Sequence, residues 1–173
     1  MSDFWVFGYG SLMWRPGFAY AEAVPATLVG AHRALCVYSH VHRGTREHPG
    51  LVLGLDRGGA CRGTGYRVGQ EKRDEVLAYL RERELVTDVY RESVRPIRLR
   101  SGNTVPAITY IVDRSHPQYA GALPRERLLA LVRDSRGRSG ANRDYVINTV
   151  EHLRALGVRD GTLEWLAERL LAG

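Results

Sequence analysis

Two glycines on either side of a tyrosine form the first pattern in the chain that can do chemistry. They follow the apolar run FWVF, and the segment reads Gly8, Tyr9, Gly10, Ser11 and Leu12. Glycine permits positive φ angles and lets a ligand approach bare backbone, so consecutive N–H groups can converge on a carboxylate or a developing oxyanion. The segment therefore predicts an anion cradle; the alternative is an ordinary glycine turn after a strand.

The same segment does not match the common nucleotide-binding motifs. The third glycine of GxGxxG is absent because Leu12, Met13 and Trp14 follow Ser11, and no GK[ST] is present to make a P-loop. Ser11 also lies outside the GxSxG pattern of serine hydrolases. Nucleotide binding and serine hydrolysis are therefore disfavoured.

A glutamate continues the apolar face of an expected helix. From residue 70 to about 85 the chain has no Gly or Pro, and Leu77, Leu80 and Glu84 fall on one stripe. Partial burial raises the pKa of a carboxyl group toward the working pH, which suits a general base. Glu84 is thus a candidate base, whereas Glu75 belongs to the opposite, solvated face. The alternative for Glu84 is a helix-end residue turned to solvent or paired with a neighbouring arginine.

The histidines and cysteines give little support for a metal site. His40 and His42 alternate on an expected strand, with His48 nearby, but no HExxH or CxxC completes a ligand set. We expect no metal, and histidines that lie on the surface or form hydrogen bonds. Cys36 and Cys61 form no disulfide framework and are expected to be buried thiols.

The elements that position these residues are strands first and helices afterwards. Short apolar runs separated by Gly, Pro, Asn or charges predict strands at 4–7, 28–38, 51–55, 61–68, 89–99 and 105–112. In the last third, helices are expected after Pro124, between an Asn142 cap and a Gly157 stop, and after Thr162. The order predicts an α+β fold, and no linker or repeat divides residues 1–173, so we expect a single domain.

Composition describes a globular protein with an excess of positive charge. The 173 residues carry a formal net charge of +6, and every basic residue except Lys72 is an arginine. The arginines are scattered, and the densest basic segment, 133–143, contains Gly and Ser and reads as a loop, so a small anion is favoured over nucleic acid. No apolar run is long enough for a membrane span and no signal peptide is visible, so a cytoplasmic protein is expected.

Several segments, in order, resemble one family. They cover residues from about 4 to 156 and read FWVFGYGSLMW, HRGTREHPGLVLGL at 42–55, YLRERE at 79–84, HPQYAG at 116–121 and SGANRDY at 139–145. Together they resemble the ChaC family of glutathione-specific γ-glutamylcyclotransferases. The stretch 35–41 departs from the family pattern, which bears on recognition beyond the γ-glutamyl group.

The resemblance implies a γ-glutamylcyclotransferase-like mixed β-barrel with flanking helices, without cofactor or metal. It implies a lyase reaction in which glutathione is cleaved to 5-oxoproline and Cys-Gly. The loop that would hold the γ-glutamyl group corresponds to Gly8, Tyr9, Gly10, Ser11, Leu12 and Met13. The family's catalytic glutamate corresponds to Glu84, and Tyr119 resembles a tyrosine that lines the pocket.

Two alternatives stay open. The same cyclisation can act on other γ-glutamyl amino acids or amines, which a substrate panel distinguishes. A non-catalytic protein that binds an anion or nucleic acid would instead show salt-sensitive binding and no release of 5-oxoproline. Glutathione is the expected small-molecule partner, with no nucleic acid and no membrane, and a monomer is favoured.

Overall fold

The computed structural model describes residues 3–85 and 87–173, and its chain divides into two compact units. The first consists of Met1–Ala34 and Gly54–His116, and the second of Leu35–Leu53 and Pro117–Gly173. The expectation that residues 1–173 form a single domain stays a prediction.

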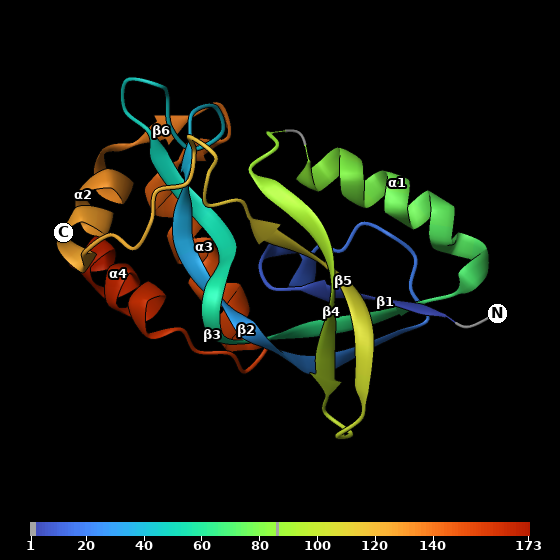
Figure 1. The fold of residues 1–173 in the computed structure, drawn as a ribbon. Helices are drawn as coiled ribbons and strands as arrows, with labels where there is room; N and C mark the ends of the chain where they lie inside the picture. The colour runs from blue at the N-terminus through green and yellow to red at the C-terminus, as the bar shows by residue number, and fades with distance from the viewer. Residues whose placement is uncertain (1–2, 86) are drawn as a thin grey trace. The chain divides into compact units, whose positions relative to one another are not determined.

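The first unit is built on a closed barrel with the strand order β1-β3-β2-β4-β5 (Figure 1). The strands are β1 (Phe4–Gly8), β2 (Glu22–Ser39), β3 (Gly50–Val68), β4 (Tyr90–Leu99) and β5 (Thr104–Val112). Strand β1 is antiparallel to β3 and parallel to β5, so it closes the barrel and delivers the chain to Gly8. With the helices of both units this confirms the α+β class.

Strand β3 differs from the sequence prediction because it joins two expected strands. The residues between the runs 51–55 and 61–68 remain in extended pairing, and Gly58 and Gly59 have φ angles of +101° and +70°. Glycine adopts such angles at little cost, so the strand bends there without ending. The turn signal in the sequence marks a bend within one strand.

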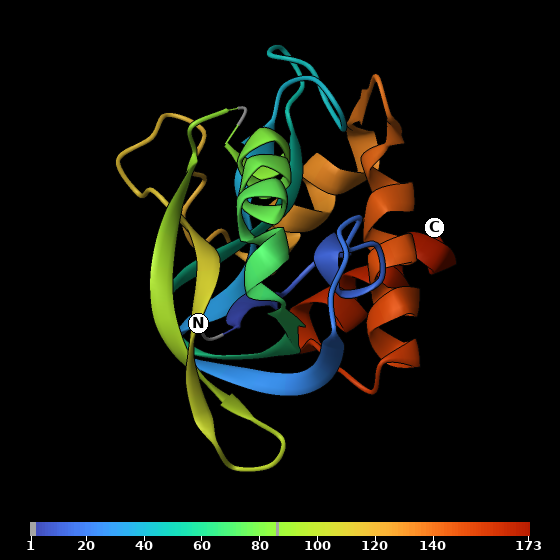
Figure 2. The ribbon, with the colours of Figure 1, turned by 90° about the vertical axis from the view of Figure 1, so that its right-hand side faces the viewer.

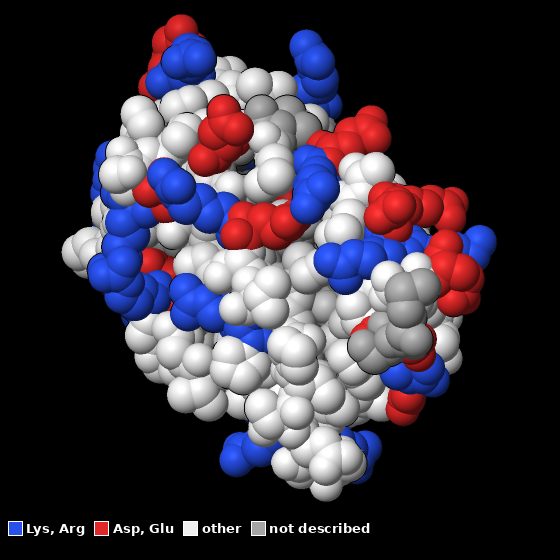
Figure 3. Space-filling view, turned by 45° about the vertical axis from the view of Figure 1, so that its right-hand side comes forward, with Lys and Arg blue, Asp and Glu red and all other residues white. Residues whose placement is uncertain are grey.

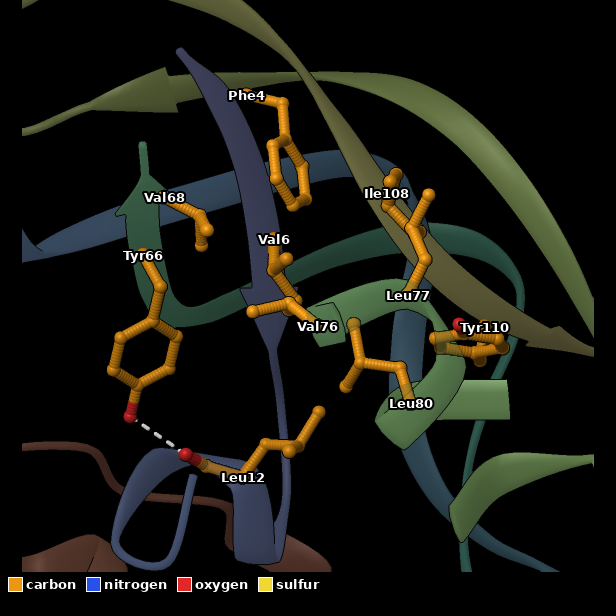
Figure 4. Packing of buried hydrophobic residues seen from close by; sticks show 10 residues of the cluster. All are labelled: Phe4, Val6, Leu12, Tyr66, Val68, Val76, Leu77, Leu80, Ile108 and Tyr110. Carbon is orange, nitrogen blue, oxygen red and sulfur yellow. Dashed lines mark hydrogen bonds between the residues drawn. The ribbon is translucent and has the colours of Figure 1, made fainter. Parts of the chain in front are cut away.

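Helix α1 (Arg73–Glu84) covers an apolar cluster in the first unit, and a short 3-10 turn, η2 (Gln70–Lys72), leads into it. Val76, Leu77 and Leu80 are its buried side chains, as the three-and-four spacing predicts. Figure 4 shows them with the rest of the cluster, which consists of Phe4, Val6, Leu12, Tyr66, Val68, Ile108 and Tyr110. Leu12 comes from the glycine loop, so loop and helix share one core.

In the second unit, α2 (Arg125–Asp134), α3 (Asn142–Ala155) and α4 (Gly161–Ala172) pack against one another (Figure 2). A hairpin of two very short strands, β6 (Arg136–Gly137) and β7 (Gly140–Ala141), precedes α3. No helix among the described residues is both long and apolar enough to cross a membrane.

The helix termini of this unit correct two of the predicted caps. Asn142 is the first residue of α3 and does not cap it, because its buried side chain bonds the backbone N–H and C=O of Leu51. Asp160, not Thr162, caps α4 by accepting from the N–H of Leu163. Gly157, with φ of +75°, follows α3 as expected of a stop residue.

Candidate active site

The chain leaves β1 at Gly8 and turns at once into a short 3-10 helix, η1 (Ser11–Met13). The N–H of Met13 donates to the carbonyl of Gly10 over 2.8 Å, which closes the turn. Neither Gly8 nor Gly10 has a positive φ, and Gly10 has φ of −128°, so the expected positive angles are absent. Gly8 instead allows close packing, because a Cβ there would lie 3.0 Å from the Cβ of Leu12, which is a tight contact.

Two side chains from distant strands hold the backbone of this loop. The Nε of Arg33 donates to the carbonyl of Tyr9 over 2.7 Å, and the Arg33 guanidinium is buried. The hydroxyl of Tyr66 lies 2.6 Å from the carbonyl oxygen of Leu12 (Figure 4) and 3.0 Å from that of Met13. Burial raises the pKa of Tyr66 to about 12, so this phenol remains a neutral donor at ordinary pH.

Burial within the loop is uneven. Five of its six residues are buried, and only Ser11 is exposed; the buried ones are Gly8, Tyr9, Gly10, Leu12 and Met13. Arg33 and Tyr66 thus hold the loop carbonyls by hydrogen bonds, while the Ser11 side chain stays exposed to solvent.

Glu84 is the last residue of α1, and its side chain is 15% exposed. Burial raises the pKa of this carboxyl, and the positive charge of Arg83 partly opposes the rise. The Nε of Arg83 lies 3.8 Å from Oε1, beyond hydrogen-bond distance, and no described residue donates a hydrogen bond to the Glu84 carboxylate. The sequence prediction of a packed acid on this helix face is confirmed.

Tyr110 lies within electrostatic reach of this acid. Its hydroxyl donates to Glu92 over 2.9 Å. Burial, that hydrogen bond and the negative charges of Glu92 and Glu84 all raise the pKa of Tyr110. Tyr110 therefore stays a neutral phenol within electrostatic reach of Glu84.

Arg83 connects the helix end to the glycine loop. Its Nη2 donates to the Oγ of Ser11 over 2.7 Å, and its Nη1 donates to the carbonyl of Arg15 over 2.7 Å and lies 3.0 Å from the Tyr79 hydroxyl. Consecutive residues of α1 thus carry a fixed link to the loop and an acid whose pKa is raised. Arg83 thus ties the end of α1, where Glu84 lies, to the predicted loop.

Tyr119, the remaining predicted site residue, belongs to the second unit. It forms an isolated bridge with Val37, and the neighbouring Ala120 N–H donates to the carbonyl of Cys36 over 2.7 Å. These contacts place it beside the end of β2 within its own unit. A role for Tyr119 in lining the site stays a prediction.

Three residues that contact the loop were not predicted as site residues, namely Arg33, Tyr66 and Arg83. Arg83 had a local signal, because Tyr79 and Arg83 stand four apart on the helix, where side chains meet. Arg33 and Tyr66 had none, since their loop contacts span 24 and 54 positions of the chain.

The two histidines considered as metal ligands, His40 and His42, contact different residues. The Nδ1 of His42 is 2.9 Å from the Oγ of Ser139, and the ring of His40 stacks on Tyr38. Within residues 3–85 and 87–173, no three His, Cys, Asp or Glu side chains are grouped to hold a metal.

The chain is similar to known proteins over most of its length. The chain is 37% identical over 171 residues to the glutathione-specific gamma-glutamylcyclotransferase of Escherichia coli, covering 97% of this chain and 74% of the relative. It is 32% identical to human glutathione-specific gamma-glutamylcyclotransferase 1 over 157 residues, or 88% of this chain and 71% of the relative.

A solved structure shares the fold. The crystal structure of a yeast gamma-glutamyl cyclotransferase specific to glutathione matches with a TM-score of 0.86 at 22% identity, covering 99% of this chain and 97% of that one. The model of the ChaC-like protein family matches residues 4–172. With this match over nearly its whole length, and a loop and helix arranged as described, the chain belongs to the ChaC family.

Proposed function

We propose that the protein is a lyase that cleaves glutathione to 5-oxoproline and Cys-Gly, with Glu84 as its general base. Membership of the ChaC family and the names of its relatives in Escherichia coli and humans support this reaction. The site supplies the parts that the chemistry requires, and no cofactor takes part in the proposal.

The first step is a proton transfer. The α-ammonium group of the γ-glutamyl unit has no lone pair until a base removes a proton. An ordinary glutamate is a weak base near pH 7, whereas the raised pKa of Glu84 brings it closer to the pH at which it must act. Glu84 therefore takes the proton and becomes a neutral acid.

Ring closure follows within the substrate. The amine lone pair forms a bond to the γ-carbonyl carbon, and the carbonyl π electrons move onto oxygen. Their return breaks the bond to the cysteine nitrogen. The nitrogen that enters the ring loses two protons in all. The departing cysteine nitrogen gains two protons, one of them returned by Glu84, and is released as an ammonium group.

The loop is proposed to hold the substrate in a folded pose. Well-oriented intramolecular reactions reach effective molarities of up to about 10⁸ M, so positioning supplies much of the catalysis. We assign the γ-glutamyl group to the loop from Gly8 to Met13, whose N–H groups bind either the α-carboxylate or the oxyanion. The link from Arg83 to Ser11 supports this assignment.

One observation carries the proposal: an acid with a raised pKa adjoins the arginine that is bonded to the glycine loop. The test is to incubate purified protein with glutathione and to measure both products by mass spectrometry. Glu84→Gln is expected to remain folded and to lower turnover by about 10²-fold or more, the scale of a positioned acid or base.

The matched control is Glu82→Gln, which makes the same change at an exposed position of the same helix. It is expected to leave turnover unchanged. Near-normal turnover in folded Glu84→Gln would remove Glu84 from this role, and absence of 5-oxoproline from the unaltered protein would remove the proposed function.

A panel of γ-glutamyl amino acids and amines in the same assay separates glutathione specificity from the broader cyclisation. We further propose that the protein acts as a monomer in the cytoplasm. The buried Cys36 and Cys61, neither of which forms a disulfide, are consistent with a reducing compartment.

A further inference from the structure

A cleft opens in the first unit just beyond the point where β2 and β4 stop pairing. Their register runs from Ala26–Leu99 to Leu28–Ile97, and Gly30, which has a φ of +102°, follows two residues later in β2. The cleft has a volume of about 530 Å³, which lies within the range of small-molecule sites.

Four arginines from three segments stand on its wall, namely Arg57, Arg91, Arg95 and Arg114. Two of them are fixed by acids. The Nε of Arg114 is 2.7 Å from Asp56, whose side chain is 5% exposed, and Arg91 is 2.7 Å from Asp113. Hydrogen bonds from Ser115 and, to a smaller extent, from Arg91 lower the pKa of Asp113 to about 2, so this acid stays ionised.

The other two arginines have no acidic partner. Neither Arg57 nor Arg95 lies within ion-pair distance of a carboxylate in the described part of the chain, and the Nε of Arg95 donates only to Ser93. Glu92, the remaining acid on the wall, receives two hydrogen bonds from Arg81, each 3.0 Å long. The acids around the cleft are therefore neutralised, and two positive charges are left over.

The sheet beneath the cleft also carries an unused polar group. Ser93 on the cleft wall pairs across the ladder with Thr109, which lies two positions from Ile111 and so on the same face of β5. The hydroxyl of Thr109 is fully buried and has no hydrogen-bond partner within the described residues. Thr109 is not among the residues that line the cleft, so the charge of the site comes from the arginines on its wall.

We propose that the cleft binds a small anion that carries two or more phosphate or carboxylate groups. The planar guanidinium offers paired N–H donors that match both groups, and two uncompensated cations favour a ligand of at least two negative charges. The arginines are exposed, so the attraction is screened by salt and is measured at fixed ionic strength. The proposal does not depend on the cyclisation reaction.

The test is isothermal titration calorimetry with pyrophosphate and, separately, with citrate, each at constant ionic strength. Saturable binding to the unaltered protein is expected. Arg57→Gln/Arg95→Gln is expected to weaken it by about tenfold or more, a difference that calorimetry resolves well. Preference for pyrophosphate or for citrate identifies the phosphate or the carboxylate as the group recognised.

The matched control is Arg98→Gln/Arg100→Gln, which removes the same charge from exposed residues near the end of β4 that do not line the cleft. It is expected to bind like the unaltered protein. Equal weakening in the two variants would show that the effect comes from the general positive charge of the molecule and would contradict a specific site. Absence of saturable binding for both anions would overturn the proposal. Turnover of glutathione by Arg57→Gln/Arg95→Gln is expected to be unchanged.

Discussion

Arg83 and Glu84 adjoin at the end of α1 but have different surroundings. The guanidinium has fixed acceptors, including Ser11 at 2.7 Å, whereas the carboxylate is largely buried without a hydrogen bond from a described residue. Arg83 is close enough to oppose the rise in the pKa of Glu84 but too far away for a hydrogen bond. Burial therefore dominates the pKa of Glu84, and the charge of Arg83 moderates its rise.

The raised pKa of Glu84 has a consequence for stability. The folded state holds this proton more tightly than the unfolded state, so stability falls as pH rises from the ordinary value of 4.5 through the raised folded value. At pH 7.5 Glu84→Gln is expected to melt at a higher temperature than the unaltered protein, and the gap is expected to shrink as pH falls toward 4.5. Thermal melts across this range check it; a gap that widens on acidification would contradict the burial argument.

A second prediction concerns Arg83 as a positioning residue. Arg83→Met removes the bonds to the loop and the charge that lowers the pKa of Glu84, so turnover is expected to drop and the acid limb of kcat to move to higher pH. Arg83→Lys keeps a charge but not the fork geometry, so its turnover is expected to drop with the acid limb close to its original position. If both variants keep the original acid limb, Arg83 does not act through Glu84.

Sequence reasoning reached Glu84 but not the full role of Arg83. The helix period places Leu77, Leu80 and Glu84 on one face, which is a local property. The partner of Arg83, Ser11, lies 72 positions away, and only the folded chain brings the two together.

At the scale of elements, the glycine loop is held by strands rather than by its own turn alone. Tyr66→Phe removes the hydroxyl that contacts the carbonyls of Leu12 and Met13. Buried carbonyls left without a donor cost about 1–3 kcal/mol, so urea unfolding is expected to show a loss of this size, with a raised KM for glutathione. Tyr20→Phe is the control, because Tyr20 is 47% exposed and packs against the same ring; an equal loss there would rule out the loop contact as the cause.

Most elements could be predicted because their signals are local, and two of the failures share one cause. The glycines of β3 indicated a break, but pairing with neighbouring strands continues through them. Asn142 is of a residue type that often caps helices, yet its side-chain amide forms hydrogen bonds with the backbone of Leu51, 91 positions away. In both places a long-range partner decides the outcome, which a local pattern does not contain.

At the scale of the whole molecule, the arginines that give the excess of positive charge are scattered along the sequence. Figure 3 shows basic and acidic residues intermingled on the face in view, without a continuous basic stripe. Nucleic-acid binders concentrate their positive charge along one surface. The distribution on this face gives the nucleic-acid alternative no added support.

The single-domain prediction can be tested by unfolding. Leu80 and Leu153 are fully buried in the first and second unit, respectively, and replacing either with Ala is expected to cost about 2–5 kcal/mol. If residues 1–173 unfold together, each substitution lowers one shared calorimetric transition. Two transitions, with each variant moving only one, would show two domains.

The route of the chain has a further consequence for inheritance. Each unit consists of two separate stretches of sequence, because the chain crosses from the first unit into the second within β2 and returns within β3. No single cut in the gene yields either unit intact. A single crossover therefore cannot exchange the unit that carries Glu84 and the glycine loop without also dividing it or transferring part of the other unit.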